Sequence, residues 1–191
     1  MIYILSGPIG SGKTSYLKSI NSQFDFFSNL HLFRNLISTD DFLKVKKSEF
    51  SSLYSICSNI ADNRALINRC NEFLSSFSLN IRLHETNAES GWITFKSEKE
   101  KLTRPLANIS EGEKTIFILW LILEASNQSL ILDTCDSLLP EEALKIWCKH
   151  LNNVSEKGKN VYISTVRPDA YISECSNCSL IEYNLWNYKK I

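Results

Sequence analysis

The segment at residues 7–14 is Gly7-Pro8-Ile9-Gly10-Ser11-Gly12-Lys13-Thr14, a full match to the phosphate-binding pattern G-x-x-x-x-G-K-[ST]. It follows an apolar run at residues 2–5 and precedes a helical pattern at residues 15–20, so a strand, a loop and a helix are predicted in that order. Glycines let the backbone curl around a phosphate chain with its N–H groups pointing inward. The segment therefore predicts a site for a nucleoside triphosphate.

A nucleoside triphosphate and Mg²⁺ are the ligands that this pattern predicts. We expect the nucleotide to be bound by the loop and the residue after it: Gly7, Pro8, Ile9, Gly10, Ser11, Gly12, Lys13, Thr14 and Ser15. Lys13 would reach the β- and γ-phosphates, which also makes it a candidate catalytic residue, and the Thr14 hydroxyl would ligate Mg²⁺. Asp133 ends the apolar run at residues 130–132 and is the second predicted Mg²⁺ ligand, because an acid at such a strand end holds the metal in phosphate-loop proteins.

The composition is that of an ordinary globular protein. The chain has 191 residues, of which 43% are apolar and 22% charged, and its formal net charge is zero. This balance gives no reason to expect nucleic acid or a membrane surface as a partner. No apolar run is long enough to span a membrane, the first strand leads directly into the phosphate loop, and six scattered cysteines are typical of reduced thiols. We therefore expect a cytoplasmic protein.

Hydrophobic periodicity predicts the remaining elements. Strands are expected at residues 2–5, 81–85, 92–96, 130–133, 161–165 and 179–186, short strands or an aromatic turn at 24–27 and 30–33, and helices at 15–20, 51–77, 110–123 and 140–154. The predicted fold class is an α/β P-loop NTPase with a mostly parallel central sheet flanked by helices, plus a small helical/β insertion. We expect one nucleotide-binding domain over residues 1–191, with a core at 1–39 and 106–191 and an inserted lobe at about 40–105.

Histidine and cysteine side chains give no strong metal signal. His31, His84 and His150 each lack a second ligand at metal-binding spacing, so structural roles are favoured for all three. Cys175 and Cys178 form one C-x-x-C pair, but neither a second pair nor two histidines complete a zinc set.

A capping box precedes the most apolar helix of the chain. Ser110 and Glu113 have the S-x-x-E spacing in which the serine hydroxyl and the glutamate carboxylate each accept from the other residue's backbone N–H. The continuous apolar run at residues 116–123 then predicts a helix that is buried nearly all round.

The segment Ser110-Glu111-Gly112-Glu113-Lys114 resembles the signature of ATP-binding-cassette (ABC) ATPases. The form is that of recombination-repair and chromosome-maintenance head domains and of related bacterial defence ATPases. Asp133 follows Ser110 by 23 residues, which is the spacing of that family, and residues 163–169 look like its switch strand and the turn after it. The resemblance extends from the phosphate loop to about residue 170.

This resemblance implies a homodimer that forms when ATP binds. Two copies would stack head to tail, and the signature residues Ser110, Glu111, Gly112 and Glu113 of one copy would face the γ-phosphate held by the other. Ser110 would supply a hydroxyl and Gly112 a backbone N–H. The dimer would control an effector protein, in DNA repair or phage defence, and contact with nucleic acid is implied by the resemblance alone.

Several family positions are not filled: no glutamine is placed to sense Mg²⁺, since the only two are Gln23 and Gln128, and two catalytic positions are changed. Thr134 stands where the family has the acid that activates water, and Val166 stands where it has the switch histidine. Threonine accepts no proton at neutral pH, so general-base catalysis would lose a factor of about 10²–10⁴. Asp136 is the nearest substitute carboxylate. The resemblance thus favours a reduced ATPase whose hydrolysis is slow or lost.

Two other functions stay open at this point. In one, the chain is a stand-alone P-loop kinase or nucleoside triphosphatase acting on a small molecule, and the segment at Ser110 is only a capped core helix. In the other, the chain is a nucleotide-gated binding module without turnover.

Overall fold

A computed structural model describes most of the chain. The described residues are 1–8, 10–20, 25–28, 63–87, 92–125, 130–134, 136–137, 139–184 and 187–190. They group into two compact units, which we call the first unit (Met1–Leu30 with Ser126–Ile191) and the second unit (His31–Ala125). Ile9, the segment at 30–33 and residues 40–62 of the expected lobe lie outside the described residues. The expected division into a core and an inserted lobe at 40–105 stays a prediction.

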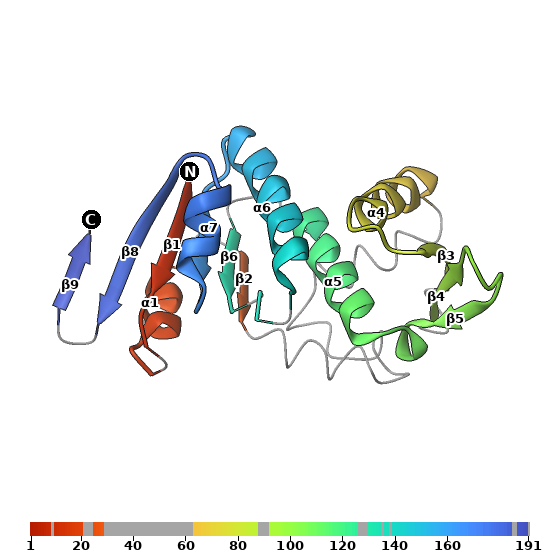
Figure 1. The fold of residues 1–191 in the computed structure, drawn as a ribbon, viewed down its shortest axis with the longest axis horizontal. Helices are drawn as coiled ribbons and strands as arrows, with labels where there is room; N and C mark the ends of the chain where they lie inside the picture. The colour runs from red at the N-terminus through yellow and green to blue at the C-terminus, as the bar shows by residue number, and fades with distance from the viewer. Residues whose placement is uncertain are drawn as a thin grey trace. The chain divides into compact units, whose positions relative to one another are not determined.

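The first unit is built on a mostly parallel sheet. Its strands are β1 (Ile2–Ser6), β2 (Asp25–Ser28), β6 (Leu130–Asp133), β7 (Val161–Ser164), β8 (Cys178–Asn184) and β9 (Asn187–Lys190). Their order is β2-β6-β7-β1-β8-β9, and among the described strand pairs of this sheet only β8–β9 is antiparallel (Figure 1). The predicted α/β class is confirmed.

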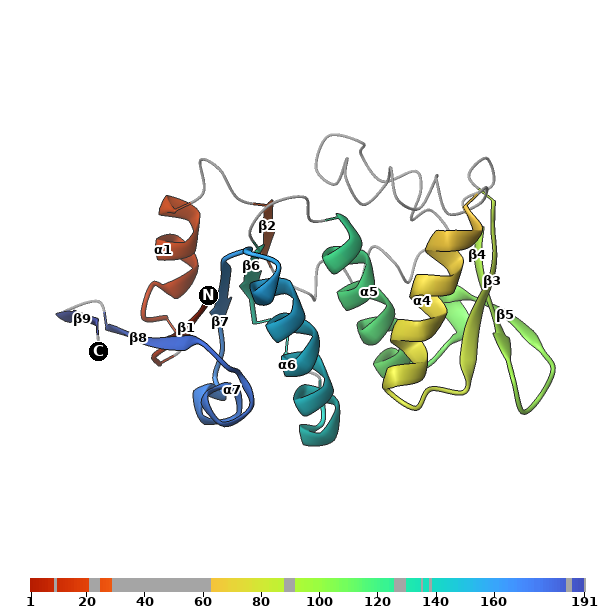
Figure 2. The same ribbon diagram turned by 90° about the horizontal axis from the view of Figure 1, so that it is seen from above.

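Helices cover both faces of this sheet. Helix α1 (Lys13–Ser19) lies on one face, and α6 (Glu141–Glu156) and α7 (Pro168–Glu174) lie on the other (Figure 2). Under α1, four buried side chains form a cluster against which Tyr3, Tyr16 and Tyr162 pack: Leu5, Leu17, Ile131 and Ile181. Because both faces are covered, the central strands are apolar at nearly every position, which is why the sequence predicted them as continuous runs.

The described part of the second unit combines a small antiparallel sheet with two α-helices. Its elements are α4 (Arg64–Ser76), β3 (Ile81–Asn87), β4 (Trp92–Ser97), β5 (Thr103–Pro105), the 3₁₀ turn η2 (Leu106–Asn108) and α5 (Glu111–Ala125). The sheet order is β3-β4-β5. Phe95 of β4 meets Phe117 of α5 edge to face, with ring centroids 5.0 Å apart. The seven residues from Ile116 to Ile122 are all buried, which confirms the prediction for this helix.

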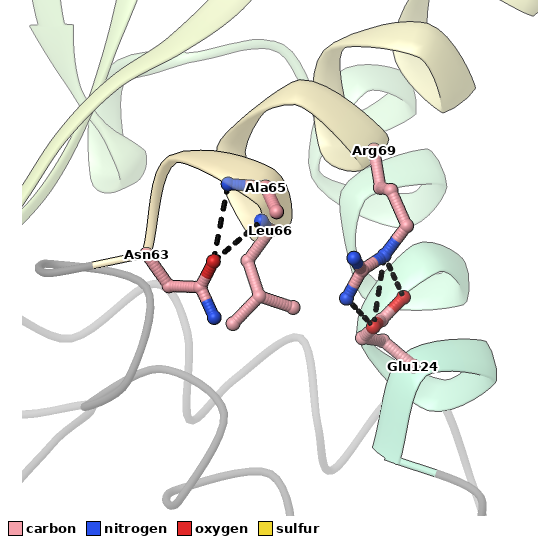
Figure 3. A network of polar contacts seen from close by, with 5 residues as sticks. All are labelled: Asn63, Ala65, Leu66, Arg69 and Glu124. Carbon is pink, nitrogen blue, oxygen red and sulfur yellow. Dashed lines mark hydrogen bonds and ion pairs between the residues drawn. The ribbon is translucent and has the colours of Figure 1, made fainter.

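Polar contacts fix the start of α4 and its position beside α5 (Figure 3). The Asn63 side-chain oxygen accepts from the backbone N–H groups of Ala65 and Leu66, at 3.1 and 3.2 Å, and so caps the helix. Arg69 of α4 forms a two-pronged ion pair with Glu124 of α5. Half of the Arg69 side chain is exposed, so this pair orients the two helices more than it stabilises them.

Among the described residues, no helix is both long and apolar enough to cross a lipid bilayer.

His150 gives the first unit a dependence on pH. It lies half-buried on α6, and burial lowers its pKa below the ordinary value of 6.5. As the pH falls below 6.5, the unfolded chain therefore binds a proton that the folded chain does not, and folding stability decreases. We expect His150→Gln to flatten the loss of unfolding free energy between about pH 7 and pH 5 in urea titrations. His84→Gln, at an exposed histidine, is the control; equal slopes for His150→Gln and the parent would contradict this assignment.

Candidate nucleotide-binding site

The predicted phosphate loop joins β1 to α1, and its three glycines have backbone angles that require glycine. The backbone φ angles of Gly7, Gly10 and Gly12 are 147°, 81° and 91°, values that residues other than glycine rarely adopt. The Ser11 N–H donates to the Pro8 carbonyl at 3.1 Å and closes the turn.

Lys13 is folded back into this loop. Its Nζ donates to the carbonyls of Gly7 and Pro8, at 2.6 and 3.0 Å, and lies 3.4 Å from the Ser11 hydroxyl. The side chain is buried, and burial lowers the pKa of its ammonium group, although the nearby Asp133 carboxylate opposes this shift. An ammonium group held inside the loop by weak neutral acceptors can exchange them for phosphate oxygens.

Thr14 and Asp133 meet at the carboxyl ends of the parallel strands. The Thr14 hydroxyl donates to Asp133 Oδ2 at 2.6 Å, across 119 residues of sequence. A hydroxyl and a carboxylate are hard oxygen donors of the kind that Mg²⁺ takes, so this pair fits the predicted metal. Ser15, the last predicted ATP contact, lies exposed in the first turn of α1.

Ser164 is a site residue that the sequence did not single out. It ends β7, is the register partner of Asp133, and donates its hydroxyl to Asp133 Oδ1. The two carboxylate oxygens are thus shared between Ser164 and Thr14, which fixes the plane of the carboxylate. The sequence did contain a signal for Ser164: it is a polar residue at the end of a predicted buried strand. In a parallel sheet, the carboxyl ends of such strands lie at the same edge as Asp133.

Thr134 follows Asp133 with a strained backbone. Its φ is 52°, a left-handed value that is rare for a β-branched residue, and its N–H donates to the Ser164 carbonyl at 3.0 Å. The side chain is half-buried. Strain of this kind persists only where surrounding contacts hold the backbone in place.

Asp136 is buried, with 1% of its surface exposed. The Thr165 hydroxyl donates to Asp136 Oδ2 at 2.7 Å, and Arg167 Nε lies 3.7 Å from the same oxygen. Burial raises the pKa of this carboxyl, while the hydrogen bond from Thr165 and the charge of Arg167 oppose the shift. Its catalytic role stays a prediction; these described contacts instead join it to the segment after β7.

The signature segment lies in the second unit and has the predicted capping box. The Ser110 N–H donates to the Glu113 carboxylate at 2.7 Å, and the Glu113 N–H lies 3.3 Å from the Ser110 hydroxyl. Ser110, Glu111 and Gly112 are exposed. The buried Lys114 pairs with Glu111 at 2.9 Å. A Cβ added to Gly112 would meet no described atom of the chain within 4 Å, so nothing in the described fold requires glycine there.

Solved structures share this fold at low sequence identity. The SMC head domain from Thermotoga maritima is 16% identical, covers 94% of this chain and 85% of its own, and has a TM-score of 0.53. An ATP-binding cassette of an ABC transporter in its ADP conformation is 12% identical, with 98% and 78% covered and a TM-score of 0.55. A structure from work on ATP-driven dimerisation and DNA-stimulated activation of SMC ATPases is 19% identical, with 66% and 82% covered and a TM-score of 0.51.

The chain therefore has the α/β fold of ABC-type ATPases, the class that includes SMC heads and transporter cassettes. It covers only 26% of an Smc head with a coiled coil and joint from Pyrococcus yayanosii, to which it is 17% identical with a TM-score of 0.51. No family model matches the sequence, and no curated protein matches it.

Proposed function

We propose that this chain is an ABC-type ATP-binding protein that dimerises head to tail on ATP and Mg²⁺, hydrolyses ATP slowly or not at all, and thereby controls a partner protein in DNA repair or phage defence. The observation that carries the proposal is the convergence of Lys13, Thr14 and Asp133 on one edge of the sheet. The choice of pathway rests on the signature resemblance.

The first unit supplies the nucleotide site. The glycine-rich backbone surrounds the phosphate chain, and Lys13 donates to the β- and γ-phosphates in place of its present carbonyl partners. Thr14 and Asp133 hold Mg²⁺, while Ser164 keeps the Asp133 carboxylate oriented. When bound, the metal supplies charge neutralisation for the phosphates.

The exposed start of α5 supplies the surface for the second copy. The N–H groups at the start of this helix of 15 residues, together with the Ser110 hydroxyl, form an anion-binding end. Gly112 supports this reading, because a helical glycine is unfavourable and no described neighbour explains it. A triphosphate brought by a neighbouring copy accounts for the open space.

Known relatives in fold make such behaviour reasonable. One matched structure comes from work on ATP-driven dimerisation of SMC ATPases. Another, 18% identical with a TM-score of 0.50, is an SMC head bound to the C-terminal winged-helix domain of ScpA. A partner protein for this chain is proposed by analogy with that complex.

Gly112→Ala tests the dimer surface. The change should raise the free energy of unfolding by about 0.5–1 kcal/mol, since alanine is the better helix former and its methyl group meets no described atom. It should also weaken ATP-dependent dimerisation at least about tenfold, since the methyl group fills space used by the triphosphate, a loss of about 1.4 kcal/mol.

Thermal unfolding and light scattering measure the two effects on the same sample. Asn68→Ala, at an exposed position of α4, is the matched control, because it also improves helix propensity but leaves the signature unchanged. If Gly112→Ala dimerises at the same ATP concentration as the parent, the result would contradict the proposed dimer surface.

The second candidate is a stand-alone kinase or nucleoside triphosphatase acting on a small molecule. Thr134 favours the kinase, because phosphoryl transfer to an acceptor hydroxyl does not need the water-activating acid that is missing at that position. Labelled ATP incubated with nucleosides and other small phosphate acceptors distinguishes the two. Rapid transfer by a monomer would favour the kinase.

A further inference from the structure

Two loops leave the ends of the strands that carry the metal site. The loop after β6 begins at Asp133 and leads to α6, and the loop after β7 begins at Ser164 and leads to α7. A backbone hydrogen bond joins the two loops where they begin, because the Thr134 N–H donates to the Ser164 carbonyl at 3.0 Å. The two loops are therefore in direct contact beside Asp133.

Arg167 holds the loop after β6 by three of its atoms. Its Nη1 donates to the Leu139 carbonyl at 2.8 Å, its Nη2 donates to the Asp136 carbonyl, and its Nε lies 3.7 Å from the Asp136 carboxylate. The planar guanidinium group can make all three contacts at once, which an ammonium group cannot.

Asp136 is the acceptor around which this contact forms. Its carboxylate also accepts a hydrogen bond from the Thr165 hydroxyl at 2.7 Å. That hydroxyl in turn accepts from the backbone N–H of Arg167 at 2.9 Å. The Thr165 N–H donates to the Leu5 carbonyl at the end of β1, at 3.1 Å. The chain of bonds thus runs from the loop after β6 to the strand that carries the phosphate loop.

We propose that Asp136 and Arg167 form a latch that holds Asp133 in the position needed to bind Mg²⁺ with the nucleotide. Both are positioning residues, and the proposal rests on the nucleotide site proposed above. Removing Arg167 takes the cation away from a buried carboxylate that keeps its hydrogen bond from Thr165, and this favours protonation of the carboxylate or its movement toward water. Either event releases the loop from β7 and lets the Asp133 carboxylate turn away from Thr14.

Arg167→Met in the full chain tests the latch. The readout is the Mg²⁺ concentration needed for binding of a fluorescent ATP analogue, compared with binding of the same analogue without Mg²⁺. We expect the Mg²⁺ requirement to rise about tenfold, as for other residues that orient metal ligands, with metal-free binding within about twofold of the parent. Arg69→Met, which breaks an ion pair of the second unit, is the control and should change neither value.

An unchanged Mg²⁺ requirement in folded Arg167→Met would overturn the latch. If this variant fails to fold, the double variant Asp136→Asn with Arg167→Met removes both charges, so that no unpaired charge is left buried. It should still need about ten times more Mg²⁺, because the contacts to the two carbonyls are gone. A double variant with the parent's Mg²⁺ requirement would overturn the proposal equally. Failure of the parent chain to bind Mg²⁺ and ATP at all would end both this proposal and the nucleotide site.

Discussion

Thr134→Glu is expected to raise the rate of ATP hydrolysis by about 10²–10⁴-fold, the usual contribution of a general base. The residue directly follows Asp133, a predicted metal ligand, and its side chain is half-buried. A glutamate there would place a proton acceptor where a water molecule can attack the γ-phosphate. Steady-state release of phosphate measures the effect.

Thr134→Gln is the control for this experiment, because it has the size and shape of glutamate but accepts no proton. A rate that rises equally in both variants would show that space, and not a base, limits hydrolysis. An unchanged rate in Thr134→Glu that still binds ATP would contradict the explanation from the missing base. The double variant Lys13→Ala with Thr134→Glu gives the rate of phosphate release that does not depend on the nucleotide site.

Lys13→Ala is expected to weaken ATP binding by roughly 100-fold or more, since truncating a buried, hydrogen-bonded charge costs about 2–5 kcal/mol. The free protein should fold normally, because the hydrogen-bond partners of the buried ammonium group among the described residues are two neutral carbonyls and a hydroxyl. Titration calorimetry with ATP measures the loss. Lys149→Ala, at an exposed position of α6, is the control, and ATP binding within threefold of the parent for Lys13→Ala would contradict the role of Lys13.

Local patterns were sufficient for much of this fold. The capping box at Ser110 and the buried strands β1, β6 and β7 depend on short runs of sequence, and the structure confirms them. Phosphate binding by the loop at residues 7–14 stays a prediction. Helix α4 was predicted over residues 51–77, and it is described from Arg64 onward. Short elements were missed: β5, α7 and β9 span three, seven and four residues, too few for a period to show.

The parts of the site that depend on distant pairing could not be predicted. Arg167 lies 31 residues from Asp136, and Ser164 lies 31 residues from Asp133, so neither contact appears in any local pattern. Both become visible only when β6 and β7 are known to be neighbours. The same holds for the ion pair between Arg69 of α4 and Glu124 of α5, which are 55 residues apart.

Light scattering with and without saturating ATP and Mg²⁺ tests the central claim most directly. Ser110→Asp is the informative variant, because aspartate keeps the helix cap while its charge repels a triphosphate, and Ser110→Asn keeps the cap without the charge. We predict that the parent and Ser110→Asn double their mass on adding ATP and that Ser110→Asp does not. A parent chain that binds ATP and Mg²⁺ to saturation and keeps the mass of a monomer would contradict the account.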